Sequence, residues 1–286
     1  MHSVIHPDFS AGAAQVLPWL EADPVSNGLQ IGIIQAIVDG LLVTDQPPLL
    51  AHVEDAGRIV GVALQSDTYR RLVLSAMPDA AATALAATVL ATDRRLPGVI
   101  GPVPAAGDFA AAWTDLSGQR SELAMAQRLH RLDRVHHPDG VPGQVRTVQQ
   151  VELELVCAWA TAMAEDIGLD AGDRDPRLAE QMERRIEDDR MLVWEVDGEP
   201  VSMAGPSRHN VGVVRIGLVY TPPLHRRQGY AAACVAAVSQ RALDSGATTC
   251  ALYTDLSNPT SNGVYRRIGY YPVCDAEELT FLPLRP

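Results

Sequence analysis

The sequence predicts an α/β (α+β) protein made of two domains, each with a sheet flanked by helices. Three observations predict this class. Helix-like and strand-like segments alternate along all 286 residues, a stretch rich in Pro and Gly interrupts them at 136–143, and the same order of elements is expected on both sides of it. A chain of this length can bury a substantial core, in one large or two modest domains. The repeated order of elements favours two.

The first half is expected to contain two helices, three strands, and then a helix, a strand, a helix and a strand. Apolar residues at three-to-four spacing indicate the first two helices, and Asn27 is a suitable N-cap for the second of them. The helices predicted here are 11–21, 27–42, 79–91 and 108–116. The strands predicted here are 49–54 and 59–65, joined as a hairpin, then 72–77, 98–103 and 120–135. For 120–135 a helix is the alternative.

Residues 136–143, with the sequence HHPDGVPG, fit neither a helix nor a strand pattern. Their Pro and Gly content predicts an interdomain linker between domains 1–135 and 144–286. A metal site would require His130, His136, His137 and Asp139 to converge. Because no further ligand cluster accompanies them, we expect a solvated linker and no metal.

The second half repeats the order of the first. The strands predicted here are 145–150, 191–196, 200–207, 213–220, 248–254 and 271–282, and the helices are 152–167, 175–188, 231–243 and 259–268. Strand 213–220 is an apolar, β-branched run that ends at Pro222 and Pro223, which cannot donate to a sheet.

Composition narrows the classes of function. The net charge is −12, and a general nucleic-acid binder usually carries a basic face, so no nucleic-acid partner is expected. The four cysteines lie far apart without metal-ligand spacing, which indicates reduced thiols and a cytoplasmic protein. The apolar run 29–43 is too short and too polar to span a membrane, and no signal peptide is apparent. The abundance of Ala and Arg is typical of a GC-rich bacterial genome. We expect the protein to be a monomer or a homodimer.

The loop between strand 213–220 and the next helix has the chemistry of an anion site. A helix start leaves backbone N–H groups unpaired and carries partial positive charge. Gly229 would let the backbone approach a phosphate without a Cβ in the way, and Arg226 and Arg227 add positive charge. The loop therefore predicts a pyrophosphate cradle fed by a strand, although a short Arg/Gly turn by itself would more often be an ordinary turn.

The downstream sequence resembles the GNAT family of acyl-CoA-dependent N-acetyltransferases. Arg226, Gly229 and Ala231 match the family's R/Q-x-x-G-x-G/A loop. A second segment matches in the right order and spacing, through Asn258, Asn262, Tyr265, Gly269 and Tyr270. The resemblance covers 144–286. It implies two GNAT-like domains, each a mixed, mostly antiparallel twisted sheet flanked by helices, of which the second is catalytic.

The resemblance implies a role for each matching residue. The backbone of Leu218, Val219 and Tyr220 would pair with the pantetheine amides of acetyl-CoA as an added strand would. Tyr265 would be the acid that protonates the departing thiolate, because a phenol donates without being charged at neutral pH. The other residues expected to hold the cofactor are Arg226, Arg227, Gln228, Gly229, Tyr230, Ala231, Asn258 and Asn262. For Asn258, capping of helix 259–268 is the alternative.

The general base is not identified by the sequence. The family often places a Glu on or beside its central strand, and 215–221 contains no carboxylate. Glu195, His209 or a water held by the backbone stay open as candidates.

These features predict an N-acetyltransferase that moves an acetyl group from acetyl-CoA to a primary amine of a small molecule or peptide. The first half lacks an R-x-x-G-x-G/A loop after 72–77, so it is expected to be a degenerate domain that binds no CoA. Two alternatives stay open: a transferase for an amino-sugar or amino-thiol metabolite, and a non-catalytic acyl-CoA sensor. The missing strand carboxylate favours the sensor, and Tyr265 favours the enzyme.

Overall fold

The computed structural model describes residues 1–168 and 177–284. They form two compact units, of which one holds Met1–Leu129, Thr254–Asn258 and the chain from Pro272 onward. The other holds His130–Tyr253 and Pro259–Tyr271. Both are mixed α/β units, as the sequence predicts.

The first unit contains a mixed sheet with helices on both faces. Its strands follow the order β1-β2-β3-β4-β5-β12-β6. Along this order from β1 as far as β12, the β4–β5 pair is parallel and the other described pairs are antiparallel. The strands are β1 (His2–Ile5), β2 (Leu49–Asp55), β3 (Arg58–Gln65), β4 (Leu72–Leu74), β5 (Gly98–Pro102), β6 (Arg120–Leu132) and β12 (Tyr271–Leu282).

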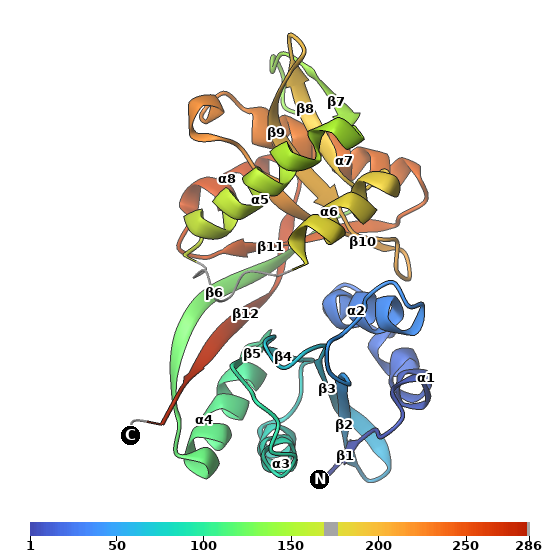
Figure 1. The fold of residues 1–286 in the computed structure, drawn as a ribbon, viewed down its shortest axis with the longest axis vertical. Helices are drawn as coiled ribbons and strands as arrows, with labels where there is room; N and C mark the ends of the chain where they lie inside the picture. The colour runs from blue at the N-terminus through green and yellow to red at the C-terminus, as the bar shows by residue number, and fades with distance from the viewer. Residues whose placement is uncertain (169–176, 285–286) are drawn as a thin grey trace. The chain divides into compact units, whose positions relative to one another are not determined.

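Two pairs of helices enclose this sheet. Residues of α3 (Asp79–Leu90) and α4 (Ala105–Ser117) form one core with the sheet, around Phe109 and Trp113. Residues of α1 (Phe9–Leu20) and α2 (Gly28–Val38) form another, around Ile31 and Leu64. Figure 1 shows the two pairs on opposite faces. Burial of these side chains supplies the main stabilising free energy of the unit.

The second unit is built around five strands in the order β11-β10-β9-β8-β7, with β6 on the outer side of β11. They are β7 (Gln144–Thr147), β8 (Leu192–Val196), β9 (Glu199–Pro206), β10 (Val213–Tyr220) and β11 (Thr249–Asp255). The pairs from β7 to β10 are antiparallel, and β10 and β11 are parallel.

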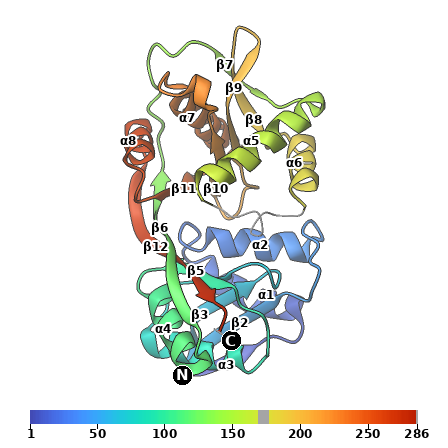
Figure 2. The same cartoon turned by 60° about the vertical axis from the view of Figure 1, so that its left-hand side comes forward.

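The helices of the second unit lie on the two faces of its sheet (Figure 2). Side chains of α5 (Leu153–Asp166) and α6 (Leu178–Glu187) form a core with Met203 and Tyr220. Side chains of α7 (Tyr230–Asp244) and α8 (Pro259–Ile268) form a separate core with Val214, Ile216 and Leu252. The two faces of β10 therefore have different surroundings.

β12 and β6 lie beside strands that are far from them in the chain. β12 comes from the C-terminal end of the chain, yet it pairs antiparallel with β5, with Glu278 opposite Ile100. β6 ends the first half of the chain, and its last residues belong to the second unit beside β11. The expected domains 1–135 and 144–286 follow the chain in order, whereas the first compact unit also takes in β12 from Pro272 onward.

Residues 136–143 are mostly exposed, and two of them are hydrogen-bonded to other parts of the second unit. The His136 backbone N–H donates to the Ile268 carbonyl at 2.7 Å, and the Trp194 indole donates to the Pro142 carbonyl at 2.8 Å. All of this segment belongs to the second unit. Within the described ranges no group of three or more His, Cys, Asp and Glu is placed to hold a metal ion.

Four local expectations differ from the structure. Asn27 stands at the N-cap position of α2, but its side chain makes no capping bond and donates instead to the Leu20 carbonyl at 3.0 Å. β4 ends at Leu74 instead of 77, and β1 was not predicted. The expected helix 175–188 begins outside the described residues and is seen from Leu178. None of the helices in the described ranges is long and apolar enough to cross a membrane.

Candidate active site

β10 carries a bulge at its centre. The register with β9 shifts between Gly217 and Tyr220, and Leu218 adopts a φ of 50°, which is unusual for a residue other than glycine. On the other side, the ladder with β11 covers Val213 to Arg215 only. The second half of β10 therefore has backbone groups that the described part of β11 does not bind, the arrangement that an added extended chain requires.

The loop after β10 ends with Gly229, which lies at the start of α7. Gly229 has a φ of 85°, a left-handed conformation that glycine adopts without a steric penalty. A Cβ at this position would lie 2.9 Å from Cγ2 of Val141, closer than real Cβ contacts allow. Both the backbone conformation and the approach of Val141 thus require glycine here. From the sequence we expected glycine here for another reason, namely that it leaves room for a phosphate.

The first turn of α7 presents free backbone donors. The first helical bond runs from the Ala233 N–H to the Gly229 carbonyl at 3.0 Å, so the preceding N–H groups of the turn have no helical acceptor. No side chain caps this end, and the first turn contains no acidic residue. The donors and the partial positive charge of the helix start are consequently available to an anion.

The side chains of the loop hold its shape. Arg226 donates to the Thr221 carbonyl at 2.9 Å and forms an ion pair with Asp166, so its charge is already shared with a carboxylate. The Tyr230 hydroxyl donates to the Gln228 amide oxygen at 3.0 Å, and the ring is buried. Arg227 is exposed, with a φ of 66°. Arg226 and Gln228 therefore order the loop, and a direct contact of Arg226 or Arg227 with a cofactor stays a prediction.

Tyr265 lies on α8 within the core that also includes Val219 of β10 and Ala232 and Cys234 of α7. The structure thus brings together the bulged strand, the helix start and the expected acid. Burial raises the pKa of Tyr265 to about 12, with a further increase from Cys234. At neutral pH the phenol is accordingly protonated, which is the form a proton donor needs.

The neighbouring tyrosines differ from Tyr265 in their hydroxyl contacts. The Tyr270 hydroxyl is buried and hydrogen-bonded to Ser239 at 2.8 Å, and the Tyr271 hydroxyl donates to Asp133 at 2.5 Å. Among the described residues the Tyr265 hydroxyl has no hydrogen-bond partner. Its ring packs edge-on against Tyr270, with centroids 6.0 Å apart. Of these three phenols, Tyr265 is the one whose proton is available.

Asn258 and Asn262 flank the start of α8. Asn258 directly precedes the helix, and its backbone N–H donates to the Asp255 carbonyl at 3.1 Å. Asn262 lies in the first turns of the helix. Their contacts with a cofactor, and capping by Asn258, stay predictions.

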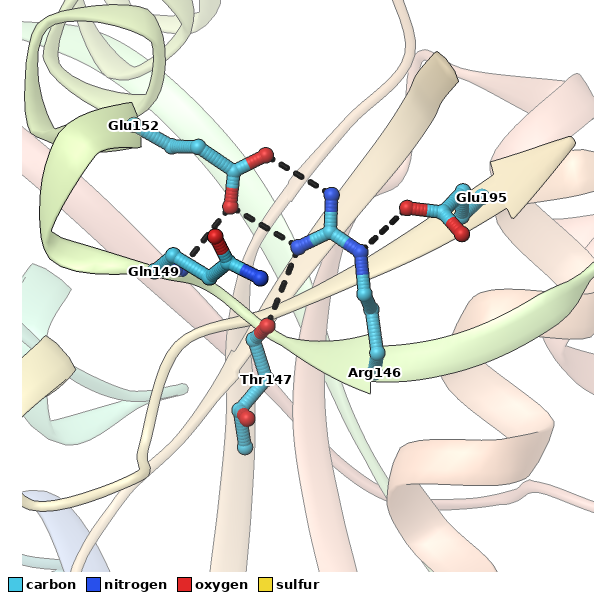
Figure 3. A network of polar contacts seen from close by, with 5 residues as sticks. All are labelled: Arg146, Thr147, Gln149, Glu152 and Glu195. Atoms are coloured by element: carbon cyan, nitrogen blue, oxygen red, sulfur yellow. Dashed lines mark hydrogen bonds and ion pairs between the residues drawn. The ribbon is translucent and has the colours of Figure 1, made fainter. Parts of the chain in front are cut away.

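Glu195 is occupied elsewhere and is poorly placed to be the base. Arg146 donates to its carboxylate and also holds Glu152 with two bonds of 2.7 and 2.8 Å, as Figure 3 shows. The Arg146 bonds lower the pKa of Glu152. Glu195 also lies on β8, which is separated from β10 by β9. The network instead fastens β7 to β8 and to the start of α5.

His209 lies at the opposite end of β10 from the cradle. It is exposed in the turn before β10, where Asn210 and Val213 form an isolated bridge. Neither side chain that the sequence offered as a base therefore lies at the bulge. The sequence signals that could have pointed to the bulge itself are Gly205 and Gly217, since a glycine inside a strand often marks one.

Comparison with known proteins agrees with this geometry. Residues 156–270 match the model of the acetyltransferase (GNAT) family. None of the curated proteins compared with this sequence matches it.

Solved structures with this fold cover nearly the whole chain. A GCN5-related N-acetyltransferase from Sphaerobacter thermophilus is 16% identical, with a TM-score of 0.63 over 99% of this chain and 96% of its own. A GNAT-family acetyltransferase from Colwellia psychrerythraea is 11% identical, with a TM-score of 0.61 over 98% and 99%. A tandem GNAT protein from the clavulanic acid biosynthesis pathway is 13% identical, with a TM-score of 0.57 over 98% of both chains.

At these identities the structural likeness shows a shared fold. The likeness to the family comes from the match over 156–270, which contains the bulged strand, the glycine at the start of α7 and Tyr265. This stretch of the second unit is therefore similar to the acetyltransferase (GNAT) family.

Proposed function

We propose that the second unit transfers an acetyl group from acetyl-CoA to a primary amine of a small molecule or peptide. This proposal rests on three features that follow one another along the chain. β10 has a bulge and a second half that β11 does not pair, Gly229 comes next, and no side chain caps the start of α7. The free strand edge suits the amides of a pantetheine arm, and the helix start suits a pyrophosphate. Bound there, acetyl-CoA would supply an activated thioester.

The side chains have distinct tasks in such a transfer. The bulge orients the thioester carbonyl against the amine, and orientation removes much of the barrier to a bimolecular reaction. The amine nitrogen forms a bond to the carbonyl carbon while the carbon–sulfur bond breaks. Tyr265 gives its proton to the departing sulfur, and the amine loses a proton to solvent or to a base. Because 215–221 contains no carboxylate, a water held by the β10 backbone is the acceptor that we favour.

The proposal is tested by supplying acetyl-CoA with a panel of amines and following the release of free thiol. We expect thiol release that depends on both an amine and the protein. The panel should include amino sugars and amino thiols, because a transferase for such metabolites is the nearest alternative. Tight acetyl-CoA binding without turnover of any amine would instead favour a non-catalytic acyl-CoA sensor, which the absence of a carboxylate on β10 also suits.

We expect one CoA to bind per chain. In the first unit β4 ends after three residues, and α3 begins with Asp79 in its first turn, whereas the first turn of α7 has no acidic residue. A carboxylate at a helix start already interacts with the dipole and repels a second anion. Isothermal titration of acetyl-CoA should give a stoichiometry near one, and a value near two would overturn the assignment of the first unit as a degenerate domain.

A further inference from the structure

Two arginines lie on the face of β10 that α5 and α6 cover. Val214 and Ile216 belong to the core beneath α7 and α8, so Arg215 and Gly217 point to the other face. Arg185 comes from α6, and its guanidinium donates to the Pro206 carbonyl at 3.2 Å. The two charges are near enough that Arg215 contributes to lowering the pKa of Arg185.

These two arginines lack carboxylate partners among the described residues. Asp188 is an acidic side chain whose charge raises the pKa of Arg185. One oxygen of Asp188 is already shared by Arg190 at 2.7 Å and Arg208 at 2.5 Å. The group that raises the pKa of Arg215 is Tyr253, and a phenol is uncharged at neutral pH. Arg185, Arg190 and Arg208 act on the single carboxylate of Asp188, and Arg215 adds a further charge beside Arg185, so this cluster carries excess positive charge.

Arg185 and Arg215 are half-buried, which makes this excess charge costly. Desolvation lowers the pKa of Arg215, and it lowers the pKa of Arg185 to about 10, so that Arg185 remains charged at neutral pH. A cation withdrawn from water without a counter-ion is unfavourable, and proteins usually pair it. Within an acidic chain of net charge −12, such a local excess of cations is a specific feature of this site.

Open space lies beside the arginines, at the bulge. Gly217 and Gly205 are directly opposite each other on β10 and β9. A Cβ at Gly217 would meet nothing within 4 Å, whereas one at Gly205 would lie 3.4 Å from the Arg185 guanidinium and 3.2 Å from Leu218. Because residues two apart on a strand share a face, Arg215 borders the space at Gly217. This space adjoins the point where the thioester is expected.

We propose that the amine acceptor also carries an anionic oxygen group, a carboxylate or a phosphate, which Arg215 and Arg185 bind beside Gly217. This inference deepens the proposed function and rests on it for the identity of the acceptor. A guanidinium suits both anions, because its fork of N–H groups matches their oxygens. The acceptor would thus be of amino-acid or amino-phosphate type, in contrast to the polycationic amine that an acidic protein would suggest.

The first test is anion binding in the presence of excess CoA, which occupies the cradle at α7. Thermal unfolding is followed with rising succinate or inorganic phosphate, against chloride of equal ionic strength. We expect a saturable rise of Tm in the wild type, since a ligand of the native state stabilises it. The rise should be lost in Arg215→Gln, reduced in Arg185→Gln, partly kept in Arg215→Lys and unchanged in Arg241→Gln, which removes an exposed charge from α7.

The result separates a binding role from a structural one. If Arg185 and Arg215 only brace β9 and β10, their variants change Tm itself but leave the anion-dependent rise intact, and the proposal is overturned. The absence of a saturable rise in the wild type also overturns it. A rise with only one of the two anions identifies which group the site takes.

The second test compares matched amines as acceptors of acetyl-CoA. We expect kcat/KM for β-alanine to exceed that for β-alaninamide, or for phosphoethanolamine that for ethanolamine, by about 10-fold to 10²-fold, the scale of a charge-assisted hydrogen bond. Equal turnover of both members of each pair, without anion binding, rejects the inference and leaves the acetyltransferase function standing. Anion binding that depends on Arg215, without turnover of any amine, retains the anion site and rejects the proposed function.

Discussion

Tyr265→Phe is expected to lower kcat by on the order of 10²-fold or more while acetyl-CoA affinity barely changes. The substitution keeps the ring, its place in the core with Val219 and Cys234, and its edge-on contact with Tyr270. It removes the proton that the departing thiolate would take. Because burial holds the pKa of Tyr265 at about 12, the wild-type phenol stays protonated through neutral pH and the loss should be seen throughout that range.

Steady-state kinetics and calorimetry on the same preparations measure this effect. A fall in kcat and kcat/KM together marks an interaction made in the transition state. Tyr270→Phe is the matched control, since it removes a hydroxyl that bonds to Ser239 at 2.8 Å. It should lower the free energy of unfolding by about 1 kcal/mol and leave turnover near wild type. A fully active Tyr265→Phe protein would exclude Tyr265 as the acid.

Gly229→Asp is expected to weaken acetyl-CoA binding by about 10²-fold or more, which corresponds to ~2.8 kcal/mol. The new carboxylate would occupy the start of α7, where the free N–H groups and the helix dipole otherwise favour a pyrophosphate. Aspartate tolerates a positive φ better than most residues, but its Cβ would lie against Val141. Calorimetry with acetyl-CoA measures the affinity, and circular dichroism verifies the fold.

Three further variants separate the effect of the charge from the effect of steric crowding. Val141→Ala alone should bind acetyl-CoA nearly as well as wild type, and combined with Gly229→Asp it removes the steric contact but keeps the charge. Gly229→Ala should cause a smaller loss than Gly229→Asp, because it adds a Cβ without a charge. Unchanged affinity in the Gly229→Asp protein would remove the cradle from this loop.

The strongest local patterns predicted their elements closely. The structure confirms helix 259–268 and strand 213–220 with the same bounds, because Pro222 ends the apolar, β-branched run of the strand, while Pro259 begins the helix and Gly269 follows it. The segments that separate strand 49–54 from 59–65 and strand 191–196 from 200–207 are turns, with positive φ at Gly57 and Gly198. Side-chain pattern and turn chemistry are local properties, so they can be read from sequence.

Weaker signals failed where tertiary contacts decide. β1 is only four residues long, and its strand form depends on pairing with β2, from His2 opposite Glu54 to Ile5 opposite Ala51. Asn27 is of a residue type that often caps helices, but its side chain donates to the Leu20 carbonyl in the protein interior. A short strand or a cap competes with many alternatives of similar free energy, so the surrounding fold chooses.

The sequence by itself determined the fold class, the strand–loop–helix unit and the choice of Gly229 and Tyr265, because these depend on residue types at fixed spacing. The tertiary structure alone decided that β12 pairs with β5, that the backbone at 136–143 bonds to the second unit, and that Leu218 adopts a positive φ. It also decided that Arg146 engages Glu195 and that Arg185 approaches Arg215. Contacts between residues tens of positions apart depend on how sheets and helices close around a shared core, and no local pattern encodes that closure.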